Sequence, residues 1–406
     1  MGNNIKSQDI GYQIGAQADR TTASVALLDF APNADAVALM PVTETVEYDT
    51  DHYDPGVKYT DLVSRNRSAM PCATPLYPTV VGTLFNAVFI RNAAGDLDYH
   101  EIKRWWRSAI GGTEDKGETF QGCIFDSVNL AIARSDTNQP IVFDAQVMIN
   151  AKRRILTAAT SPTPDLSKQP AYGSAGVLID FVSDDTVDSL GGDDAQVRAV
   201  SVSFSNQLTL DGVEDNLADP PLHRSWLTHV CGNPKIDVTV TARVSDDNYL
   251  RLDEYTTIPK GKLRLAFTHP KGASITSTST LSSGSTGNQT LLVAATAGFL
   301  VGDTVVVKHP TSGFAITKVV TINTDVSIVV GGYDPRVTLN GSSGGALTIR
   351  SMCAGLVIDS MDFKSRSSTK RAGAFQTIDL NYTTTLKAGA TFPLEILATD
   401  VANSRL

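Results

Sequence analysis

The feature that most constrains the fold is an alternating pattern that occurs twice. The sequence GCIFDS at 122–127 recurs as GLVIDS at 355–360, and each copy continues into alternating residues, a polar turn and a second alternating segment. The returning segments carry on one face Phe143, Ala145, Val147 and Ile149 in the first copy and Gln376, Ile378, Leu380 and Tyr382 in the second. A period of two on both sides of a turn predicts a long β-hairpin with one apolar face. The chain is therefore expected to contain two related β units.

Segments upstream of the two hairpins also resemble each other. Residues 41–48 alternate like residues 199–205, and residues 82–90 are similar to residues 232–240. The segments at 82–90 and 232–240 are separated by fewer residues than the hairpin motifs at 122–127 and 355–360. This difference predicts that the second unit carries an insertion.

The composition locates the insertion at residues 272–350. Ser, Thr and Gly dominate this segment, and its only charged residues are Asp303, Lys308, Lys318, Asp325, Asp334, Arg336 and Arg350. Short β-branched runs alternate there with Gly and Pro, which is typical of a small all-β module. Because it lies between two strands of the second unit, we expect it to project outward.

Helical signals are few. Residues 96–110 place apolar side chains at helical spacing, and a Gly pair follows as a stop signal. The stripe consists of Tyr99, Ile102, Trp106 and Ala109. This pattern predicts a helix between the strands of the first unit.

The motifs and the charge argue against an enzyme or a nucleic-acid-binding protein. With 34 Lys+Arg against 43 Asp+Glu, the formal net charge is -9, which is poorly suited to gripping phosphates. The string GSSGG at 341–345 lacks the strand-turn-helix context of a nucleophile elbow. The Asp pairs at 184–185, 193–194 and 246–247 lack calcium-loop spacing, and His223 and His229 are interpreted as residues of a surface or interface loop. We expect no catalytic, metal-binding or cofactor-binding residues.

The cysteines and the N-terminus suggest a cytoplasmic site of assembly. The four cysteines lie far apart without a Cys-x-x-Cys motif and are expected to be reduced and packed. The first residues lack the layout of a signal peptide, and no apolar run is long enough for a membrane span.

The polar faces of the predicted strands are small and mildly acidic. Such a face is either an ordinary solvent-exposed surface or the wall of a pore that a polyanion crosses without sticking. The candidate lumen-facing residues are Ser127, Asn129, Asp144, Gln146, Asp237, Thr239, Asp362, Asp379 and Asn381.

The order of these elements resembles the major tail tube protein of long-tailed, non-contractile (siphovirus-type) bacteriophages, in the class whose subunit carries two tube folds. The resemblance rests on the two hairpins, the strand pairs before them and the insertion. It implies a mainly β chain with two tandem β-sandwich or barrel folds, one or two short helices and an immunoglobulin-like or similar small β module.

The same resemblance implies an assembly. Each fold would contribute a four-stranded sheet to an inner barrel, three subunits would close a pseudo-hexameric ring, and rings would stack into a tube for genome ejection. The implied partners are further copies of the chain, a tape measure protein in the lumen, terminator and distal tail proteins at the ends, and viral DNA only in transit. The implied location is the virion tail, assembled in the host cytoplasm without contact with a membrane or a cofactor. Residues 1–35, 51–78 and 210–231 are candidates for reaching the next ring.

The predicted domains follow from these boundaries: an N-terminal arm at 1–35, a first tail-tube fold at 36–155, a linker at 156–196, a second tail-tube fold at 197–271 and 351–406, and the inserted module at 272–350.

Three other functions fit parts of the pattern. Another tail component of the same fold, such as a distal tail or terminator protein, would usually carry one copy. A carbohydrate-binding surface protein would be expected to carry a signal peptide. A β-rich enzyme could use Asp126 and Asp359, the carboxylates of the two repeated motifs.

Overall fold

The structure is a computed structural model. It describes residues 10–30, 44–48, 59–65, 68–92, 95–106, 116–133, 138–155, 170–183, 197–211, 214–215, 224–225, 228–243, 260–282, 287–331, 338–369, 376–385 and 394–405. The Asp pairs at 184–185, 193–194 and 246–247 and the residue His223 lie outside these ranges. Within them, no helix is both long enough and apolar enough to cross a membrane.

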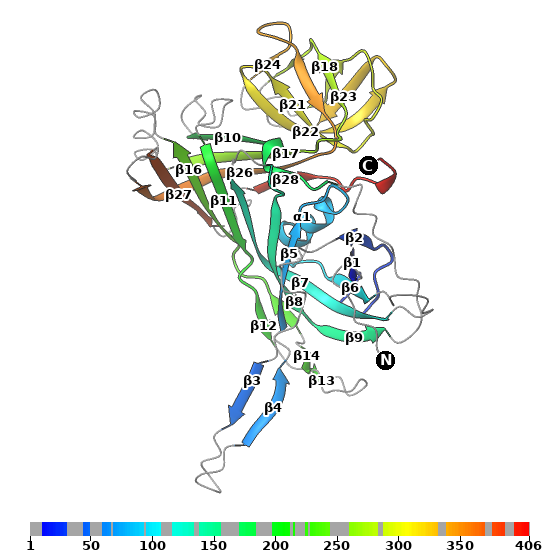
Figure 1. The fold of residues 1–406 in the computed structure, drawn as a ribbon, viewed down its shortest axis with the longest axis vertical. Helices are drawn as coiled ribbons and strands as arrows, with labels where there is room; N and C mark the ends of the chain where they lie inside the picture. The colour runs from blue at the N-terminus through cyan, green and yellow to red at the C-terminus, as the bar shows by residue number, and fades with distance from the viewer. Residues whose placement is uncertain are drawn as a thin grey trace.

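The chain is mainly β, and one large sheet forms its body (Figure 1). The first half of the chain contributes β1 (Ile10–Ala16), β2 (Leu28–Phe30), β5 (Ser68–Pro75), α1 (Val81–Phe89), β6 (His100–Trp106), β7 (Lys116–Ala133), β8 (Val142–Ile149) and β9 (Ala151–Ile155). The second half contributes β10 (Val177–Ser183), β11 (Val197–Ser205), β16 (Lys235–Arg243), β17 (Lys260–Thr268), β26 (Cys353–Thr369), β27 (Thr377–Thr385) and β28 (Leu394–Ala398).

Both predicted hairpins are confirmed, and they occupy equivalent places in the sheet. The first half of β7 pairs with β6 and β9, and its second half pairs with β8. In the same way, β26 pairs first with β17 and β28 and then with β27. The β7–β8 register shifts at Asp126, and the β17–β26 register shifts across Asp359 and Ser360. The repeated Asp-Ser motif therefore marks a β-bulge in each copy.

Alternation gives the hairpins one buried face, as predicted. Phe143, Ala145, Val147 and Ile149 are at most 2% exposed, and Leu380 and Tyr382 are equally well buried. Both copies contribute to a single hydrophobic core. At its centre, Phe85 of α1 contacts Phe143 and Phe267 with ring centroids 6.3 and 6.2 Å apart. The copies therefore share one interior.

The similarity of residues 82–90 to residues 232–240 does not extend to their structure, because Val81–Phe89 forms α1 whereas Lys235–Arg243 forms β16. The buried apolar residues of α1 are Val81, Leu84, Phe85, Val88 and Phe89. Their spacing matches one face of a helix rather than alternate positions of a strand. By its pairing with β8, β5 is the counterpart of β16.

The helix predicted for residues 96–110 was also wrong: His100–Trp106 forms β6. This strand lies between β1 and β7 and pairs with both. Glu101 and Ile102 are both buried although they point to opposite faces. Burial on both faces removes the alternation that identifies a strand, so a helical stripe could arise by coincidence.

Two segments assigned to an arm and a linker contribute strands. Within residues 1–35, β1 pairs with β6, and within residues 156–196, β10 pairs with β17. Each of these pairings joins seven residue pairs. These two strands therefore belong to the body of the molecule.

The segment between β17 and β26 forms its own sheets around its own core. They contain β18 (Ser274–Ser277), β19 (Thr280–Leu281), β20 (Gln289–Leu292), β21 (Thr304–His309), β22 (Gly313–Asn323), β23 (Ser327–Gly331), β24 (Leu339–Asn340) and β25 (Leu347–Arg350). This module lies at the top of Figure 1, and the GSSGG string forms a turn between β24 and β25.

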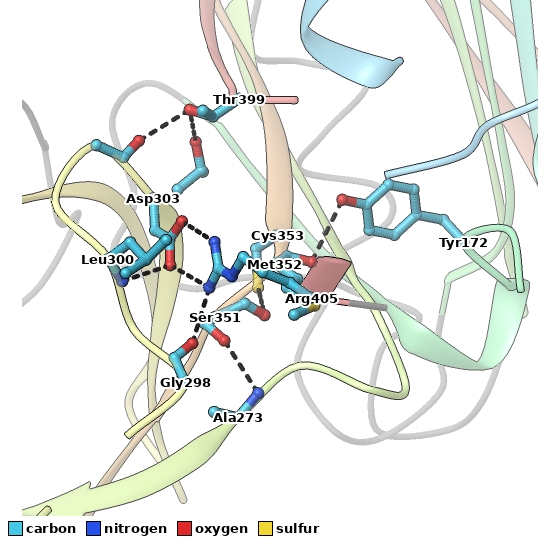
Figure 2. Close-up of polar contacts among 12 residues, drawn as sticks. Tyr172, Ala273, Gly298, Leu300, Asp303, Ser351, Met352, Cys353, Thr399 and Arg405 are labelled. Carbon is cyan, nitrogen blue, oxygen red and sulfur yellow. Dashed lines mark hydrogen bonds and ion pairs between the residues drawn. The ribbon is translucent and has the colours of Figure 1, made fainter. Parts of the chain in front are cut away.

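The C-terminal residues fasten the module to the body (Figure 2). The Arg405 guanidinium donates to both carboxylate oxygens of Asp303 at 2.6 and 2.8 Å and to the carbonyl oxygen of Gly298 at 2.8 Å. Asp303 also accepts the backbone N–H of Leu300 at 2.9 Å, and Thr399 donates to the carbonyl oxygen of Gly302 at 3.0 Å. Bidentate pairing of this kind fixes orientation as well as distance.

A second projection lies at the opposite end of the molecule. The strands β3 (Glu44–Tyr48) and β4 (Tyr59–Arg65) form a hairpin at the bottom of Figure 1. Near its base lie β12 (Thr209–Asp211), β13 (Glu214–Asp215), β14 (Arg224–Ser225) and β15 (Thr228–Val230). β14 pairs with β4, so both halves of the chain contribute to this end.

Asp400 caps α1 from the far end of the sequence. Its carboxylate accepts the N–H of Gly82 at 2.7 Å and the hydroxyl of Thr83 at 2.7 Å. We expect Asp400→Ala to lower the free energy of unfolding by about 0.5–2 kcal/mol, since the first turn of α1 loses its acceptor. Denaturant unfolding measures this loss.

Asp400→Asn is the matched control. Burial raises the pKa of the Asp400 carboxyl, against the lowering effect of its hydrogen bonds, so a neutral amide tests acceptor loss separately from charge. The amide of Asp400→Asn keeps one acceptor oxygen. This variant should therefore lose less free energy of unfolding than Asp400→Ala. Equal stability of Asp400→Ala and the wild type would contradict this role.

Candidate functional surface

An ordered polar surface spans the face of the sheet opposite α1. Seven strands form this face in the order β5, β8, β7, β11, β16, β27 and the second half of β26. Six of them carry its polar side chains, whereas β5 places Pro71 and Ala73 beside Gln146 and Asp144. Directly paired residues of antiparallel strands point to the same face. The surface therefore crosses both copies without interruption, because β7 pairs with β11 over seven residue pairs.

All nine lumen-facing candidates lie on this surface. The register aligns Asp144 with Asn129, Asn129 with Ser203 and Ser203 with Asp237. Asp237 then aligns with Thr383, and Thr383 with Asp362. The neighbouring rows hold the remaining candidates, Ser127, Gln146, Thr239, Asp379 and Asn381.

Hydrogen bonds tie these polar side chains together across strands. Thr239 donates to the Asn381 amide oxygen at 2.9 Å, and the Asn381 amide nitrogen donates to Ser365 at 3.2 Å. In the next row, Thr241 and Ser367 donate to the two Asp379 carboxylate oxygens at 2.6 and 3.4 Å. These contacts occupy the polar groups within the sheet, which leaves a surface of short side chains.

The acidic groups are partly neutralised by two lysines. Lys235 and Lys364 lie 2.6 and 3.3 Å from the carboxylate oxygens of Asp237. Partial burial alone would raise the pKa of Asp237, but hydrogen bonds from Lys235, Thr383 and Lys364 together lower it. Asp237 is therefore ionised at neutral pH, and its charge is balanced locally.

The structure adds residues that sequence reasoning missed. Thr383 continues the alternation of β27 and could have been found from it, two residues after Asn381. Ser365 and Ser367 lie on the surface only because the β26–β27 register shifts between Phe363 and Ser365. The same shift pairs Arg366 with Leu380 and places it on the opposite face. A bulge reverses the phase of alternation, and the sequence carries no signal for it here.

Two strand edges of this surface pair on one side only within the described residues. β5 pairs with β8 alone, and the second half of β26, from Phe363 onward, pairs with β27 alone. Elsewhere on the surface, every strand has a neighbour on each side. Strand edges of this type offer backbone donors and acceptors to another chain.

The two repeated carboxylates make structural contacts. Asp126 accepts the backbone N–H of Leu208 at 3.0 Å, and Asp359 forms an ion pair with Lys262 at 3.4 Å. Each lies at the bulge of its own copy. Both contacts hold a bulge in place.

Comparison with known families decides the identity. Residues 74–301 match the model of the phage tail tube protein family, and this match covers more than half of the chain. The chain belongs to the phage tail tube protein family. It is a structural component of a phage tail. No curated protein matches the chain.

The family match spans the structural features described above. It begins near the end of β5, crosses the β7–β11 junction and ends in the module. The polar surface is therefore a feature of a tail tube protein, and its role is considered in the context of a tube.

Neighbouring residues of β27 test the division of the tail tube protein's sheet into two faces. Leu380 is fully buried, whereas Asn381 lies on the polar surface. We expect Leu380→Ala to cost about 2–5 kcal/mol of unfolding free energy through lost burial and a cavity. Asn381→Ala should cost about 1 kcal/mol or less, the net value of partly exposed hydrogen bonds. Chemical denaturation of both variants measures the difference, and equal losses would contradict the division.

Proposed function

We propose that this tail tube protein assembles into stacked rings whose inner wall is the polar surface. The observation that carries the proposal is the continuous polar surface with strand edges available at both ends. The backbone N–H and C=O groups at open strand edges gain hydrogen-bond partners when neighbouring copies extend the sheet into a closed barrel. The opposite face cannot serve as the wall, because α1 and the shared core cover it.

The junction inside one subunit provides the template for the contact between subunits. The second half of β7 pairs with β8 on one side and with β11 on the other. Its counterpart in the second copy is the second half of β26, which among the residues that the structure describes pairs with β27 only. We infer that this edge meets the first copy of the next subunit. Three subunits with two copies each would then close a pseudo-hexameric ring.

Stacking of rings needs contacts along the tube axis. The β3–β4 hairpin projects from the body at the end opposite the module (Figure 1). Of its two strands, β4 falls within residues 51–78, one of the segments that the sequence proposes for reaching the next ring, whereas β3 lies just before that segment. A contact that repeats without closing generates a filament, so a stack of rings would form a siphovirus-type tail tube.

The chemistry of the wall suits a conduit for DNA. Short polar side chains that bond to one another, with acidic groups and few cations, give a polyanion little to bind. DNA would pass through during genome ejection, after a tape measure protein leaves the lumen. Terminator and distal tail proteins would bind the two ends of a tube assembled in the host cytoplasm.

Another tail component of the same fold is the second candidate. The same strand edges would close a single ring in a terminator or distal tail protein. Electron microscopy of the purified protein distinguishes the two, since we expect stacked rings or tubes rather than isolated rings. The absence of any ring at any concentration would overturn both.

Proline substitutions test the β26 edge. In an edge strand, successive N–H groups point alternately toward the paired neighbour and toward the open side. Of Arg366→Pro and Ser367→Pro, one therefore removes a donor to β27 and the other removes a donor from the open edge. We expect the variant that removes the open-edge donor to keep the melting temperature of the isolated subunit. The same variant should abolish ring formation in electron micrographs.

Calorimetry identifies which variant leaves the subunit intact. The variant with the lower melting temperature serves as the internal control for damage to β27 pairing. If the stable variant forms rings and tubes like the wild type, the β26 edge is not the contact between subunits.

Thiol labelling tests which face lines the lumen. Asn129 is an exposed candidate, and Ser282 is an exposed residue of the module. In assembled tubes, we expect Asn129→Cys to react with a small maleimide but to resist a maleimide carried on a large polymer. Ser282→Cys should react with both, because the module would lie outside.

The native cysteines set the background. Cys72, Cys123 and Cys353 are buried and Cys231 is half-buried, so wild-type tubes give the baseline for both reagents. Equal reaction of Asn129→Cys and Ser282→Cys with the large reagent in intact tubes would place the polar surface outside the lumen.

A further inference from the structure

Three potential metal ligands converge where the two copies meet, away from the polar surface. His229 and Cys231 lie two residues apart at the end of β15, which puts them on the same side of the strand. Asp96 comes from the loop between α1 and β6 of the first copy. One ligand atom from each residue lies within 4.8 Å of the other two. Asp96 lies more than a hundred residues before His229 in the sequence, so their spacing alone does not predict a shared site.

The separations suit a small divalent cation. Zinc binds nitrogen, oxygen and sulfur ligands at about 2.0–2.3 Å. An ion placed among the three atoms would require each to move inward by less than about 1 Å, given these bond lengths. Rotation of the Asp96 and Cys231 side chains can provide that movement, because neither side chain is buried.

The loop that carries Asp96 is held in shape by its own hydrogen bonds. Asn92 accepts the N–H of Gly95 at 2.9 Å through its backbone and that of Asp96 at 3.1 Å through its side chain. Gly95 has a φ of 87°, a conformation that other residues rarely adopt. The loop therefore presents Asp96 in a defined position.

A neighbouring hydroxyl orients the imidazole. The Tyr99 hydroxyl lies 3.3 Å from Nδ1 of His229, and the two rings contact edge to face at 5.4 Å. A hydrogen bond at Nδ1 directs Nε2 toward a metal, which is the usual arrangement around ligating histidines.

The segment after Cys231 is also anchored to the first copy. Arg91 donates to the carbonyl oxygen of Gly232 at 2.8 Å and to the side chain of Asn206 at 3.3 Å. Cys231 also packs against a small apolar cluster that contains Leu97 and Ile124 of the first copy. Both sides of the cluster are thus fixed before a metal arrives.

We propose that Asp96, His229 and Cys231 bind one zinc ion per chain, with water in the fourth position, and that the ion fastens the first copy to β15 of the second. Nitrogen, sulfur and oxygen ligands together favour zinc over calcium or magnesium, which prefer oxygen alone. The site does not depend on the tube being the assembled form.

Metal titration of the full chain tests the proposal. After treatment with a chelator and its removal, the protein is titrated with zinc chloride by calorimetry and with cobalt chloride by absorbance. We expect one ion per chain and a thiolate-to-cobalt charge-transfer band that disappears in Cys231→Ser. Asp96→Asn and Cys231→Ser should each weaken zinc binding by at least about tenfold, since each removes a ligand.

Asp98→Asn is the matched control. Asp98 lies in the same loop, and its carboxylate contacts Asn92 at 3.4 Å outside the ligand cluster. This variant should keep wild-type zinc affinity, and zinc should raise the melting temperature of wild type and Asp98→Asn but not of Asp96→Asn. Failure of the wild type to bind stoichiometric zinc would overturn the proposal. Equal zinc binding by wild type, Asp96→Asn and Cys231→Ser would also overturn it.

Discussion

The pairing of β7 with β11 is the contact on which the rest of the structure depends. Seven residue pairs join the last strand of one copy's polar surface to the first strand of the other's. Because register fixes which side chains share a face, this pairing aligns Asn129 with Ser203 and makes one surface from two units. It also brings Phe204 of β11 to Phe89 of α1, with ring centroids 4.9 Å apart. This one pairing thus joins the polar surface across both copies and contributes to the shared core.

The two faces of the sheet differ in how much they contribute to the stability of the fold. Burial of aromatic and aliphatic side chains beneath α1 supplies the main stabilising term, since apolar area removed from water dominates folding. The other face contributes little stability, so its side chains are available for another role. Threonine, serine, asparagine and aspartate on this face form hydrogen bonds with one another across strands. In the proposed tube, this face as a whole would form the wall of the lumen.

Prediction from sequence succeeded where one period dominates. The hairpins at β7–β8 and β26–β27 alternate clearly, so their strands and the shared face of the nine polar candidates could be identified, while their position in a lumen stays a prediction. It failed where burial on both faces hides the period, as in β6, and where similarity in composition concealed helical spacing, as in α1. It also missed Ser365 and Ser367, because the bulge in β26 changes which residues face outward without leaving a signal in the sequence.

The sequence by itself determined that this chain is a duplicated β protein with a polar face on each hairpin, because alternation is a local property that neighbouring residues fix. Only the tertiary structure decided that the two faces join into one, which depends on pairing between strands distant in sequence. Tertiary structure likewise brought Arg405 to Asp303 and Asp400 to the start of α1. It also brought Asp96 within reach of His229 and Cys231. Contacts of this kind join residues that are far apart in the sequence. They depend on the tertiary packing of the whole chain, which no local sequence pattern predicts.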